Sequence, residues 1–429
     1  MILVISGAIG NSQMKNWNFL APPHSLPMPS TCKWFTCTPV RFKGDHTFFS
    51  RDSGLLCKGF QEIGVVCKAI MPGPPMDGDQ TEDLIRTDYK NLENPEWWKS
   101  LGGDGVVFYG WGSGKYLKIV RAIKQAGLLL VSHMDTSGTL GILNGISEFT
   151  GALWRISRGE RGKGPYGLLY FAVHLVYAAS LSLLRNDWPR SKHLKNADII
   201  GTVSPIAVER IRKVCRIYGS RSLADHVHLI PHPVAPYMKF LPEVLKERLL
   251  VAVGRWCDAQ KDCNLLLLTA RGVLALDQQV SLEIYGAMPP LMEVWHRDLP
   301  VGIRTRIHLK GIVPNVELRL AMQRARILVC TSLYESFHIA AAEALCCGCS
   351  VVGPDVPEFP SLKWFAADDY GRMSSRDSGS LIGAIGEEIA AWDRSERSPE
   401  HIAGHWCQLL HAPRVAERIL HLAVARNCP

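Results

Sequence analysis

The sequence of 429 residues lacks the marks of several classes of protein. Its 13 cysteines are an odd number without paired spacing, and Cys346, Cys347 and Cys349 have no histidine or second cysteine pair at zinc-ligand spacing nearby in the sequence. The apolar start at residues 1–10 has no basic segment of the kind that begins a secretion signal. No zinc-finger, homeodomain or RNA-binding signature is present. These absences favour a cytoplasmic protein with reduced thiols and without a nucleic-acid partner.

An excess of positive charge is missing from the second half of the chain. Residues 1–235 contain 27 Lys and Arg against 18 Asp and Glu, a balance of +9, whereas residues 236–429 contain 21 against 22. The contents of 47% hydrophobic and 21% charged residues are typical of a globular protein, so general disorder is excluded. The basic first half favours an anionic membrane surface or a phosphorylated substrate as a partner.

Short apolar runs alternate with helical patterns along the chain, which predicts an α/β fold with parallel, doubly wound sheets. The length fits two domains better than one core. Pro233 and Pro242 flank the expected linker, so we predict one Rossmann-like domain over 1–235, a second over 236–405 and a helical end over 406–429. We predict strands at 65–70, 106–109, 128–132, 198–204 and 227–230, and then at 249–253, 281–285, 307–310, 327–330 and 350–352.

The first fifty residues are expected to hold one strand within 1–10 and an irregular excursion over 11–50. Residues 52–63 have helical spacing, with Gly64 as a stop. An apolar run at 167–184 meets the lower length limit of a membrane span. We interpret it as a core helix, because a spanning helix would split the sheet. The alternative is a helix with a basic rim over 155–195 that lies against anionic lipid, since this segment carries eight Lys and Arg and two acidic residues.

The most informative pattern lies at residues 325–354, where a strand, a loop with Glu335, a helix with Glu343 and a second strand follow one another. The first amides of this helix, at 337–339, have no partner within the helix and lie at the positive end of its dipole, which suits a diphosphate. Glu335 would repel phosphate, but it can accept hydrogen bonds from sugar hydroxyls, and Glu343 can accept them from a ribose. The pattern indicates a nucleotide-sugar. The alternative is two ordinary glutamates of a βαβ unit.

A second pattern places two cations after a strand. Gly254 and Arg255 follow the strand at 249–253, and Lys261 comes six residues after Arg255. Ligands bind beyond the carboxyl ends of strands in open α/β sheets. Two cations there can neutralise charge that develops on a departing diphosphate, a role that a metal otherwise fills. We therefore expect no metal and no cofactor. A solvated basic loop, the alternative, would explain Lys261 but not the strand–Gly–Arg turn.

These residues resemble glycosyltransferase family 4, whose fold is GT-B. The segment from about Leu249 to Pro354 contains the family's G-R turn with its later Lys, a strand followed by glycine at 285–286, an H-L-K-G strand at 308–311 and the E-x7-E motif of Glu335 and Glu343. The resemblance implies two Rossmann-like domains that face each other across a cleft. It also implies that the last helix crosses back to the first domain.

The resemblance further implies residue roles. Arg255 and Lys261 would hold the diphosphate, Glu335 would face the transferred sugar and Glu343 would hold the ribose. The implied donor-binding residues are Gly54, Gly254, Arg255, Lys261, Gly286, Glu335, Ser336, Phe337, His338, Ile339 and Glu343, and the implied catalytic residues are Glu335, His133, Arg255 and Lys261. Ser336 and His338 stand where the family usually has glycine, which narrows the space near the sugar.

The first half resembles the family at a strand that ends in His133, at the A-D-I-I-G-T-V-S run of 197–204 and at the helix start with Gly54. The run 230–234, I-P-H-P-V, departs from the usual I-P-N-G-V. The resemblance places His133 near the reacting carbon. Alternatively, its ring satisfies a backbone group at the strand end.

Two other patterns are set aside. Asp77-Gly-Asp79 has the spacing of metal-dependent transferases but lies in a Pro/Gly loop, so we interpret it as a solvated turn. Residues 110–115, G-W-G-S-G-K, lack the Ser or Thr of a Walker A loop and are expected to line the cleft as a flexible loop.

We therefore predict a metal-independent, retaining glycosyltransferase, with retention implied by the family. Its partners would be a nucleotide-diphosphate-sugar donor and an acceptor that is a glycan, a lipid-linked molecule or a small molecule. Peripheral membrane contact would involve 155–195. Two alternatives stay open: a non-catalytic nucleotide-sugar-binding protein and a sugar-nucleotide epimerase on the same scaffold.

Overall fold

Two parallel β-sheets form the centres of two domains. The computed structural model describes residues 32–138, 141–161, 165–367 and 369–427. The first sheet has the order β3-β2-β1-β4-β5-β6-β7 and the second β10-β9-β8-β11-β12-β13, and every pairing is parallel. The strands of the first sheet are β1 (Lys33–Cys37), β2 (Val66–Pro72), β3 (Leu84–Thr87), β4 (Gly105–Phe108), β5 (Leu129–Met134), β6 (Ile199–Thr202) and β7 (Val227–Leu229). Those of the second are β8 (Glu247–Val253), β9 (Ser281–Tyr285), β10 (Ile307–Gly311), β11 (Ala325–Val329), β12 (Ser350–Pro354) and β13 (Gly371–Ser374).

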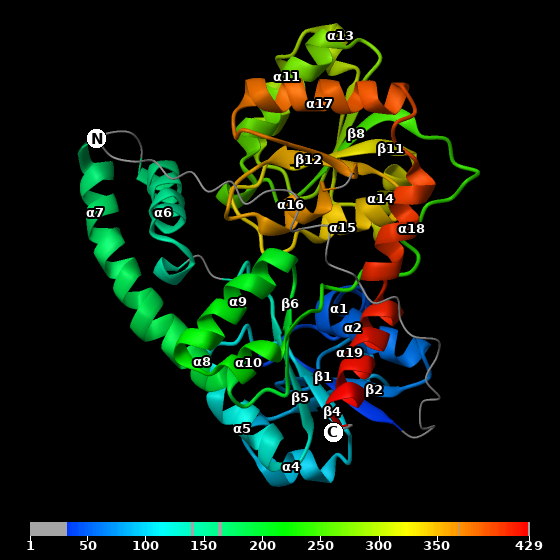
Figure 1. Cartoon of the computed structure of the whole chain (residues 1–429). Coiled ribbons are helices and arrows are strands. Elements are labelled where there is room, and N and C mark those ends of the chain that lie inside the picture. Colours follow the sequence, from blue (N-terminus) through cyan, green and yellow to red (C-terminus); the bar gives the residue numbers. More distant parts are fainter. Residues whose placement is uncertain (1–31, 139–140, 162–164, 368, 428–429) are drawn as a thin grey trace.

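Helices cover both faces of each sheet, so the fold is doubly wound (Figure 1). In the first domain they are α1 (His46–Phe49), α2 (Asp52–Glu62), α3 (Tyr89–Leu92), α4 (Pro95–Ser100), α5 (Leu117–Gln125), α6 (Ile146–Arg161), α7 (Pro165–Ser180), α8 (Trp188–Leu194), α9 (Pro205–Tyr218) and α10 (Arg221–Asp225). In the second they are α11 (Cys263–Leu276), α12 (Pro290–Arg297), α13 (Val301–Arg304), α14 (Asn315–Arg324), α15 (Ile339–Cys346), α16 (Pro360–Phe365), α17 (Ser378–Asp393) and α18 (Pro399–Leu410), and α19 (Ala412–Asn427) ends the described chain. The predicted fold class is confirmed.

The prediction of an irregular excursion over 11–50 was wrong, because β1 lies within this range and is an inner strand of the first sheet. Phe35 and Cys37 of β1 are fully buried between β2 and β4. The prolines and polar residues around this five-residue strand hid it, because a strand buried on both faces shows no alternation. The strand expected within 1–10 lies outside the described residues. The short edge strands β3 and β13 were also missed.

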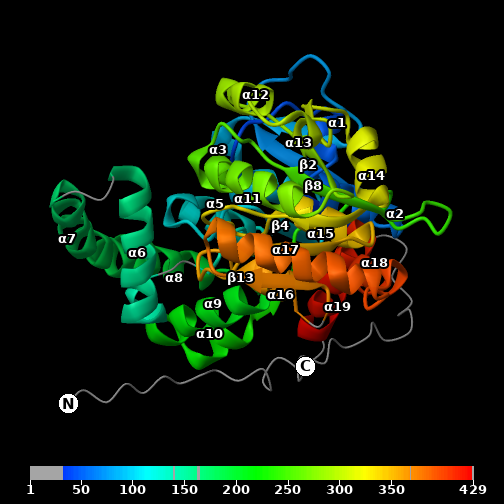
Figure 2. The same cartoon turned by 90° about the horizontal axis from the view of Figure 1, so that it is seen from above.

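The chain returns to the first domain at its end. The predicted helical end over 406–429 is interrupted at His411. There Val234 pairs with the chain by two hydrogen bonds, from Val234 N to Leu410 O at 2.7 Å and from Ala412 N to Val234 O at 2.9 Å. Helix α19 then packs on α2 (Figure 1), and Figure 2 shows α18 and α19 following one another in the view from above. Gly59 permits this approach, since a Cβ there would lie 2.4 Å from Ala412 O. Val415, Ala416 and Ile419 thereby join the first core.

The prediction of a core helix at 167–184 was wrong. Helix α7 stands at the edge of the molecule beside α6, away from both sheets (Figure 1). Tyr166, Leu169 and Val176 expose 84%, 63% and 73% of their surface. An apolar helix is normally placed in the core by its burial, but both faces of the sheet are already covered by other helices. The apolar surface of α7 therefore needs another explanation.

Candidate active site

The loops after β8 and β11 are joined to each other at the carboxyl edge of the second sheet. Thr331 Oγ1 donates to Lys261 O at 2.8 Å, Leu333 N donates to Gln260 O at 2.7 Å, and Gln260 Nε2 donates to Tyr334 O at 2.8 Å. These bonds fix the positions of two loops that are some 70 residues apart in the sequence. The edge where they meet is the one at which ligands bind in open parallel sheets.

Lys261 and Glu335 form an ion pair at this junction. Their side chains are only 14% and 11% exposed, and Ser332 Oγ donates to Glu335 Oε1 at 2.9 Å. A charge-assisted bond with low exposure holds both side chains in one orientation. The structure therefore brings together the lysine and the first glutamate that the sequence singled out.

His338 begins helix α15 in an unusual backbone conformation. Its φ is +62°, in the left-handed region that favours glycine, which explains why the resembled family has glycine there. The ring Nδ1 accepts a hydrogen bond from Ala341 N at 3.1 Å, and the ring stacks on Phe359. Burial lowers the pKa of His338 to about 4, so the ring is neutral and can accept this bond. His338 is therefore a helix cap made by a side chain.

The first turn of α15 still offers amides to a ligand. Among the described residues, the amides of Phe337, His338 and Ile339 form no backbone hydrogen bond. They lie at the positive end of the helix dipole and beside the Lys261–Glu335 pair. Such a turn can bind an anionic group such as a phosphate.

Two glycines shape the neighbouring strand ends. Gly286 has φ of +105°, and a Cβ on it would lie 1.9 Å from Gly254 O, so no larger residue fits. At Gly254 a Cβ would crowd the Lys261 side chain at 3.3 Å. Gly54, in α2 of the first domain, would meet Phe48 O at 2.3 Å. Gly54 and Gly286 are therefore required for packing, and Gly254 leaves room for the Lys261 side chain.

Arg255 lies on the cleft but points differently from Lys261. Its Nε contacts Asp258 at 3.0 Å, and its side chain is 74% exposed. It lines a cavity of about 540 Å³ together with residues of the first domain, among them Asp52, Asp135 and His232. The predicted cation pair is thus split, with Lys261 paired with Glu335 and Arg255 paired with Asp258 on an exposed part of the cleft.

The sequence reasoning missed the imidazole that faces this cavity, His232. Its Nε2 lies 2.9 Å from Asp135 Oδ1, and its Nδ1 lies 3.5 Å from Asp52 Oδ1. Burial alone would lower the pKa of His232, but the charge of Asp135 and then that of Asp52 outweigh it, so this pKa is raised. The proline-flanked run 230–234 contained the signal, since it departs from the family pattern at this residue.

Asp135 also connects the two domains. Burial would raise the pKa of Asp135, but the charge and hydrogen bond of His232 lower it below the usual range. Ser336 Oγ donates to Asp135 Oδ1 at 2.8 Å across the cleft. Arg210 of α9 adds a second link, from its Nη2 to Pro357 O at 3.0 Å. Two polar contacts therefore connect the domains across the cleft.

His133 forms a backbone contact of the kind that the alternative interpretation describes. It is fully buried, its Nε2 lies 3.1 Å from Ile230 O, and its ring stacks on Tyr109 at 4.4 Å. Burial lowers the pKa of His133 to about 3, so the ring is neutral. Tyr109, and not His133, lines the cavity.

Glu343 lies one turn inside α15 and faces the start of α2. Burial raises its pKa to about 7, although the nearby charge of Arg51 acts in the opposite direction. Part of its surface stays accessible. A carboxylate in this setting gains from hydrogen-bond donors such as ribose hydroxyls, because they favour its ionised form.

The two patterns set aside above have structural places. Asp79 is buried and not solvated, because it forms an ion pair with Arg86 at 2.7 Å and accepts a bond from Gly44 N at 2.8 Å. It thus anchors a turn, and the interpretation of this residue as part of a solvated turn was wrong. Trp111, in the glycine-rich loop 110–115, lines the cleft cavity.

The cysteines of the described residues are all free, but three ligand groups meet near the crossover. Sulfur atoms of Cys346 and Cys407 and a ring nitrogen of His411 lie within 4.8 Å of one another. The ring Nε2 of His411 lies 3.0 Å from Met238 O. The sequence analysis found no histidine near these cysteines because it compared neighbours in sequence only. Cys407 comes 61 residues after Cys346, and His411 follows it.

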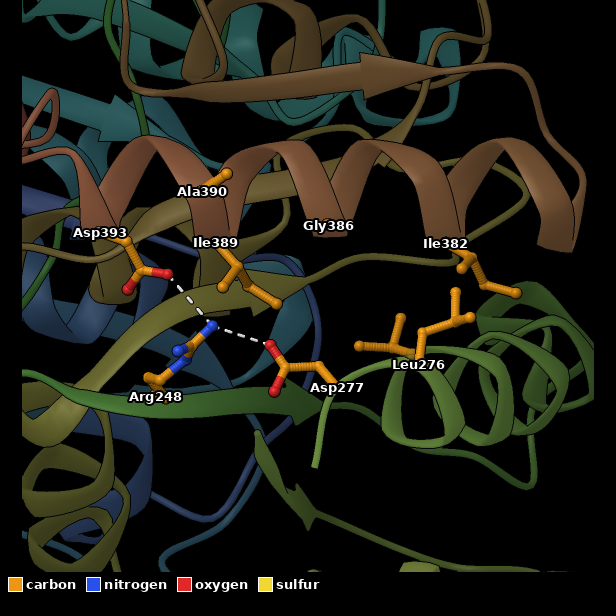
Figure 3. A pocket seen from close by; sticks show the side chains of 9 residues that line it. Arg248, Leu276, Asp277, Ile382, Gly386, Ile389, Ala390 and Asp393 are labelled. Carbon is orange, nitrogen blue, oxygen red and sulfur yellow. Dashed lines mark hydrogen bonds and ion pairs between the residues drawn. The ribbon is translucent and has the colours of Figure 1, made fainter. Parts of the chain in front are cut away.

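Another pocket lies at the opposite edge of the second sheet, between α11 and α17 (Figure 3). Its volume is about 270 Å³, and Arg248 in it is held by Asp277 at 2.8 Å and Asp393 at 3.1 Å. Since its arginine is already neutralised and it lies at the amino ends of the strands, it is not a site for the donor.

Taken together, the paired sheets, the cleft and the crossing helix define the class, which is the GT-B fold. Residues 247–376 match the family described as Glycosyl transferases group 1. A curated relative, the GDP-mannose:cellobiosyl-diphosphopolyprenol alpha-mannosyltransferase of Xanthomonas oryzae pv. oryzae (strain PXO99A), is 32% identical over 146 residues. This match spans 34% of the chain and 37% of the relative.

Solved structures share the fold over nearly the whole chain. The lipopolysaccharide outer core galactosyltransferase WaaB has a TM-score of 0.58 at 13% identity and covers 92% of this chain and 99% of its own. Sucrose-phosphate synthase from Thermosynechococcus elongatus gives 0.57 at 15%, covering 92% and 98%. Anabaena HepE in complex with UDP-glucose gives 0.56 at 13%, covering 91% and 99%. At these identities the structural likeness shows the fold alone.

Proposed function

We propose that the protein is a retaining glycosyltransferase that uses a nucleoside-diphosphate sugar as donor. The observation that carries this proposal is the meeting of the Lys261–Glu335 pair with the first turn of α15 at the carboxyl edge of the second sheet. The family match over 247–376 supports it, because that segment contains all of these residues.

Different residues would bind the different parts of the donor. Arg255 and Lys261 would contact the diphosphate with the amides of 337–339, Glu335 would accept from sugar hydroxyls, and Glu343 would accept from the ribose. Gly54, Gly254 and Gly286 would let the backbone approach the donor. Two cations would supply the charge stabilisation for which other transferases use a metal, so we propose a metal-independent reaction.

The reaction breaks the bond between the anomeric carbon and the diphosphate oxygen and forms one to the acceptor oxygen on the same face of the sugar. The acceptor proton passes to the departing phosphate oxygen, which Arg255 and Lys261 stabilise as it gains charge. No carboxylate is assigned as a covalent nucleophile, since Glu335 is paired with Lys261 and Asp135 with His232.

The acceptor would enter the cavity of about 540 Å³ between the domains. There His232 would orient the acceptor hydroxyl, because its ring lines the cavity and is held by Asp135. We place His133 behind this site as a supporting residue. We propose a cytoplasmic location, and GDP-mannose is the first donor to test because the curated relative uses it.

Ligand-induced thermal shifts with UDP, GDP and ADP and their sugars test the donor site. We expect one nucleotide series to raise the melting temperature, and we expect Arg255→Ala and Glu343→Ala to lose that shift. Unaltered shifts in both variants would refute the assignment. A second assay follows the donor: transfer to an acceptor supports the proposal. A changed sugar without any acceptor would indicate an epimerase, and tight binding without turnover would indicate a binding protein.

A further inference from the structure

Helix α7 presents an apolar stripe to solvent. Leu169, Val173 and Val176 lie along one side of the helix at spacings of four and three residues, and they expose 63%, 59% and 73% of their surface. Tyr166 and Tyr177 border this stripe with 84% and 52% exposure. Exposed apolar residues scattered singly are ordinary, but a continuous stripe of this kind marks a contact surface.

The opposite side of α7 is packed against α6. Trp154 of α6 meets Phe171 edge to face at 5.0 Å, and Gly167 is buried. Among helices α1–α19, only α6 shares extensive contacts with α7 apart from the continuous helical segment Leu181–Asp187 that follows it. Within the described part of the chain, the stripe is therefore the exposed face of a helical hairpin whose inner face is packed.

Charge distinguishes the possible occupants of the stripe. Residues 165–184 contain no charged side chain, and basic residues follow at once, with Arg185, Lys192 and Lys195 all exposed. Trp188 is 49% exposed, and the ammonium of Lys192 lies 4.2 Å from its ring centroid. Helix α9, joined to this segment by the bond from Tyr218 Oη to Leu183 O at 3.2 Å, adds exposed Lys213 and Arg216.

An uncharged stripe with tyrosines beside it, followed along the chain by exposed tryptophan and basic residues, matches the layers of an anionic bilayer surface. Apolar side chains enter the acyl boundary, aromatic rings lie at headgroup level, and Lys and Arg contact anionic headgroups. A second copy of the chain would bring two sets of positive charge together, which opposes pairing.

The helix is placed to lie on a membrane and not to cross it. The continuous helix Pro165–Leu194 is long and apolar enough to cross a membrane, since its most apolar stretch has a mean hydropathy of 1.8 and is almost entirely exposed. However, its last part belongs to the first domain, where His193 and Leu194 are fully buried. The hairpin partner α6 carries charged residues such as Glu148, which would have to enter the hydrocarbon in a spanning hairpin.

We propose that helix α7 docks the protein onto an anionic lipid bilayer, with Leu169, Val173 and Val176 in the acyl boundary and the basic residues from Arg185 to Arg216 on the headgroups. This docking stands independently of the proposed function. Where both hold, the acceptor cleft of the first domain works at a lipid surface.

Vesicle flotation of the full chain tests the docking. We expect binding to vesicles of phosphatidylcholine with about 30% phosphatidylserine to exceed binding to pure phosphatidylcholine about tenfold, and to weaken as salt rises from about 50 to 300 mM. The variant Leu169→Glu/Val176→Glu should lose binding by at least about tenfold, because it places two charges in the acyl boundary. Arg185→Glu/Lys192→Glu should lose binding to the anionic vesicles.

The matched control is Leu245→Glu/Leu276→Glu, which makes the same change at leucines that are 83% and 79% exposed on the second domain. It should bind vesicles like the unmodified chain. Absence of vesicle binding by the unmodified chain, or equal binding by the Leu169/Val176 variant, would overturn the docking. The docking would also be overturned if the unmodified chain formed a dimer that bound no vesicles and if the Leu169/Val176 variant were a monomer. Nucleotide-induced thermal shifts should be unchanged in the Leu169/Val176 variant. Failure of the docking is therefore separable from failure of the donor site.

Discussion

Ser336 and Asp135 connect the two domains by a hydrogen bond of 2.8 Å across the cleft. Ser336 stands directly after Glu335, and Asp135 holds the cavity-facing ring of His232. This one bond therefore links the donor side of the cleft to the acceptor side. Ser336, which replaces a glycine of the resembled family, thus donates a hydrogen bond to the first domain.

The Asp135–His232 pair should give stability with a defined pH window. The pKa of His232 is raised, so its contribution is present below the unfolded value and is lost as pH rises through the folded value. The pKa of Asp135 is lowered, so its contribution is lost as pH falls through the folded value. Asp135→Asn should therefore destabilise by about 2 kcal/mol near pH 6 and by less near pH 9. Urea unfolding at both values measures this, and an equal loss at both would contradict the pairing.

Lys261 should be required for catalysis more than for folding. Lys261→Ala removes the partner of Glu335 and one cation from the leaving group, so kcat should fall about 100-fold or more. Lys118→Ala, at a side chain that is 79% exposed on α5, is the control and should change nothing. Initial rates with a saturating donor measure the effect. A Lys261→Ala enzyme with an unchanged kcat would remove this lysine from the mechanism.

Nucleotide affinity should depend on the ionisation of Glu343. Its pKa is raised to about 7, and ribose hydroxyls donate to the carboxylate, so binding favours the ionised form. Affinity should increase as pH rises from about 6 toward 8, by up to about tenfold for each unit below the pKa. Titration calorimetry measures it, and Glu343→Gln should bind weakly with no such dependence. A flat profile in the unmodified chain would place the ribose elsewhere.

His338 contributes to stability through its capping ring and is held in a left-handed backbone conformation, and two substitutions together separate these effects. His338→Gly and His338→Ala both remove the capping ring, but only glycine adopts φ of +62° freely. The alanine variant should therefore be less stable than the glycine variant by about 1 kcal/mol. Thermal unfolding of the two proteins compares them directly. Equal stabilities would show that the left-handed conformation is not kept in the variants.

Local patterns predicted much of the fold, because strands that end in glycine and helices with clear stops are specified by neighbours in sequence. The strand β1 escaped prediction because five residues buried on both faces show no periodicity. Helix α7 was assigned to the core because composition reports how apolar a helix is and not what covers it. Helix α7 is exposed because other helices cover both faces of the first sheet.

The candidate site divides in the same way. Glu335 and Glu343 were singled out because they lie within one βαβ pattern at fixed spacing, and Lys261 because it follows another strand, β8. His232 and Asp135 were missed as a pair because the loops after β5 and β7 meet only in the folded chain. His133 attracted attention through its strand, although its ring points into the core and bonds Ile230.

The most direct test of the account is a structure of the protein with its nucleoside diphosphate bound. We predict that the diphosphate lies within hydrogen-bonding distance of Lys261 Nζ and of the amides of 337–339, with the ribose on Glu343 and with Arg255 turned from Asp258 toward the phosphates. A diphosphate bound away from this junction, with the Lys261–Glu335 pair and the first turn of α15 untouched, would contradict the account.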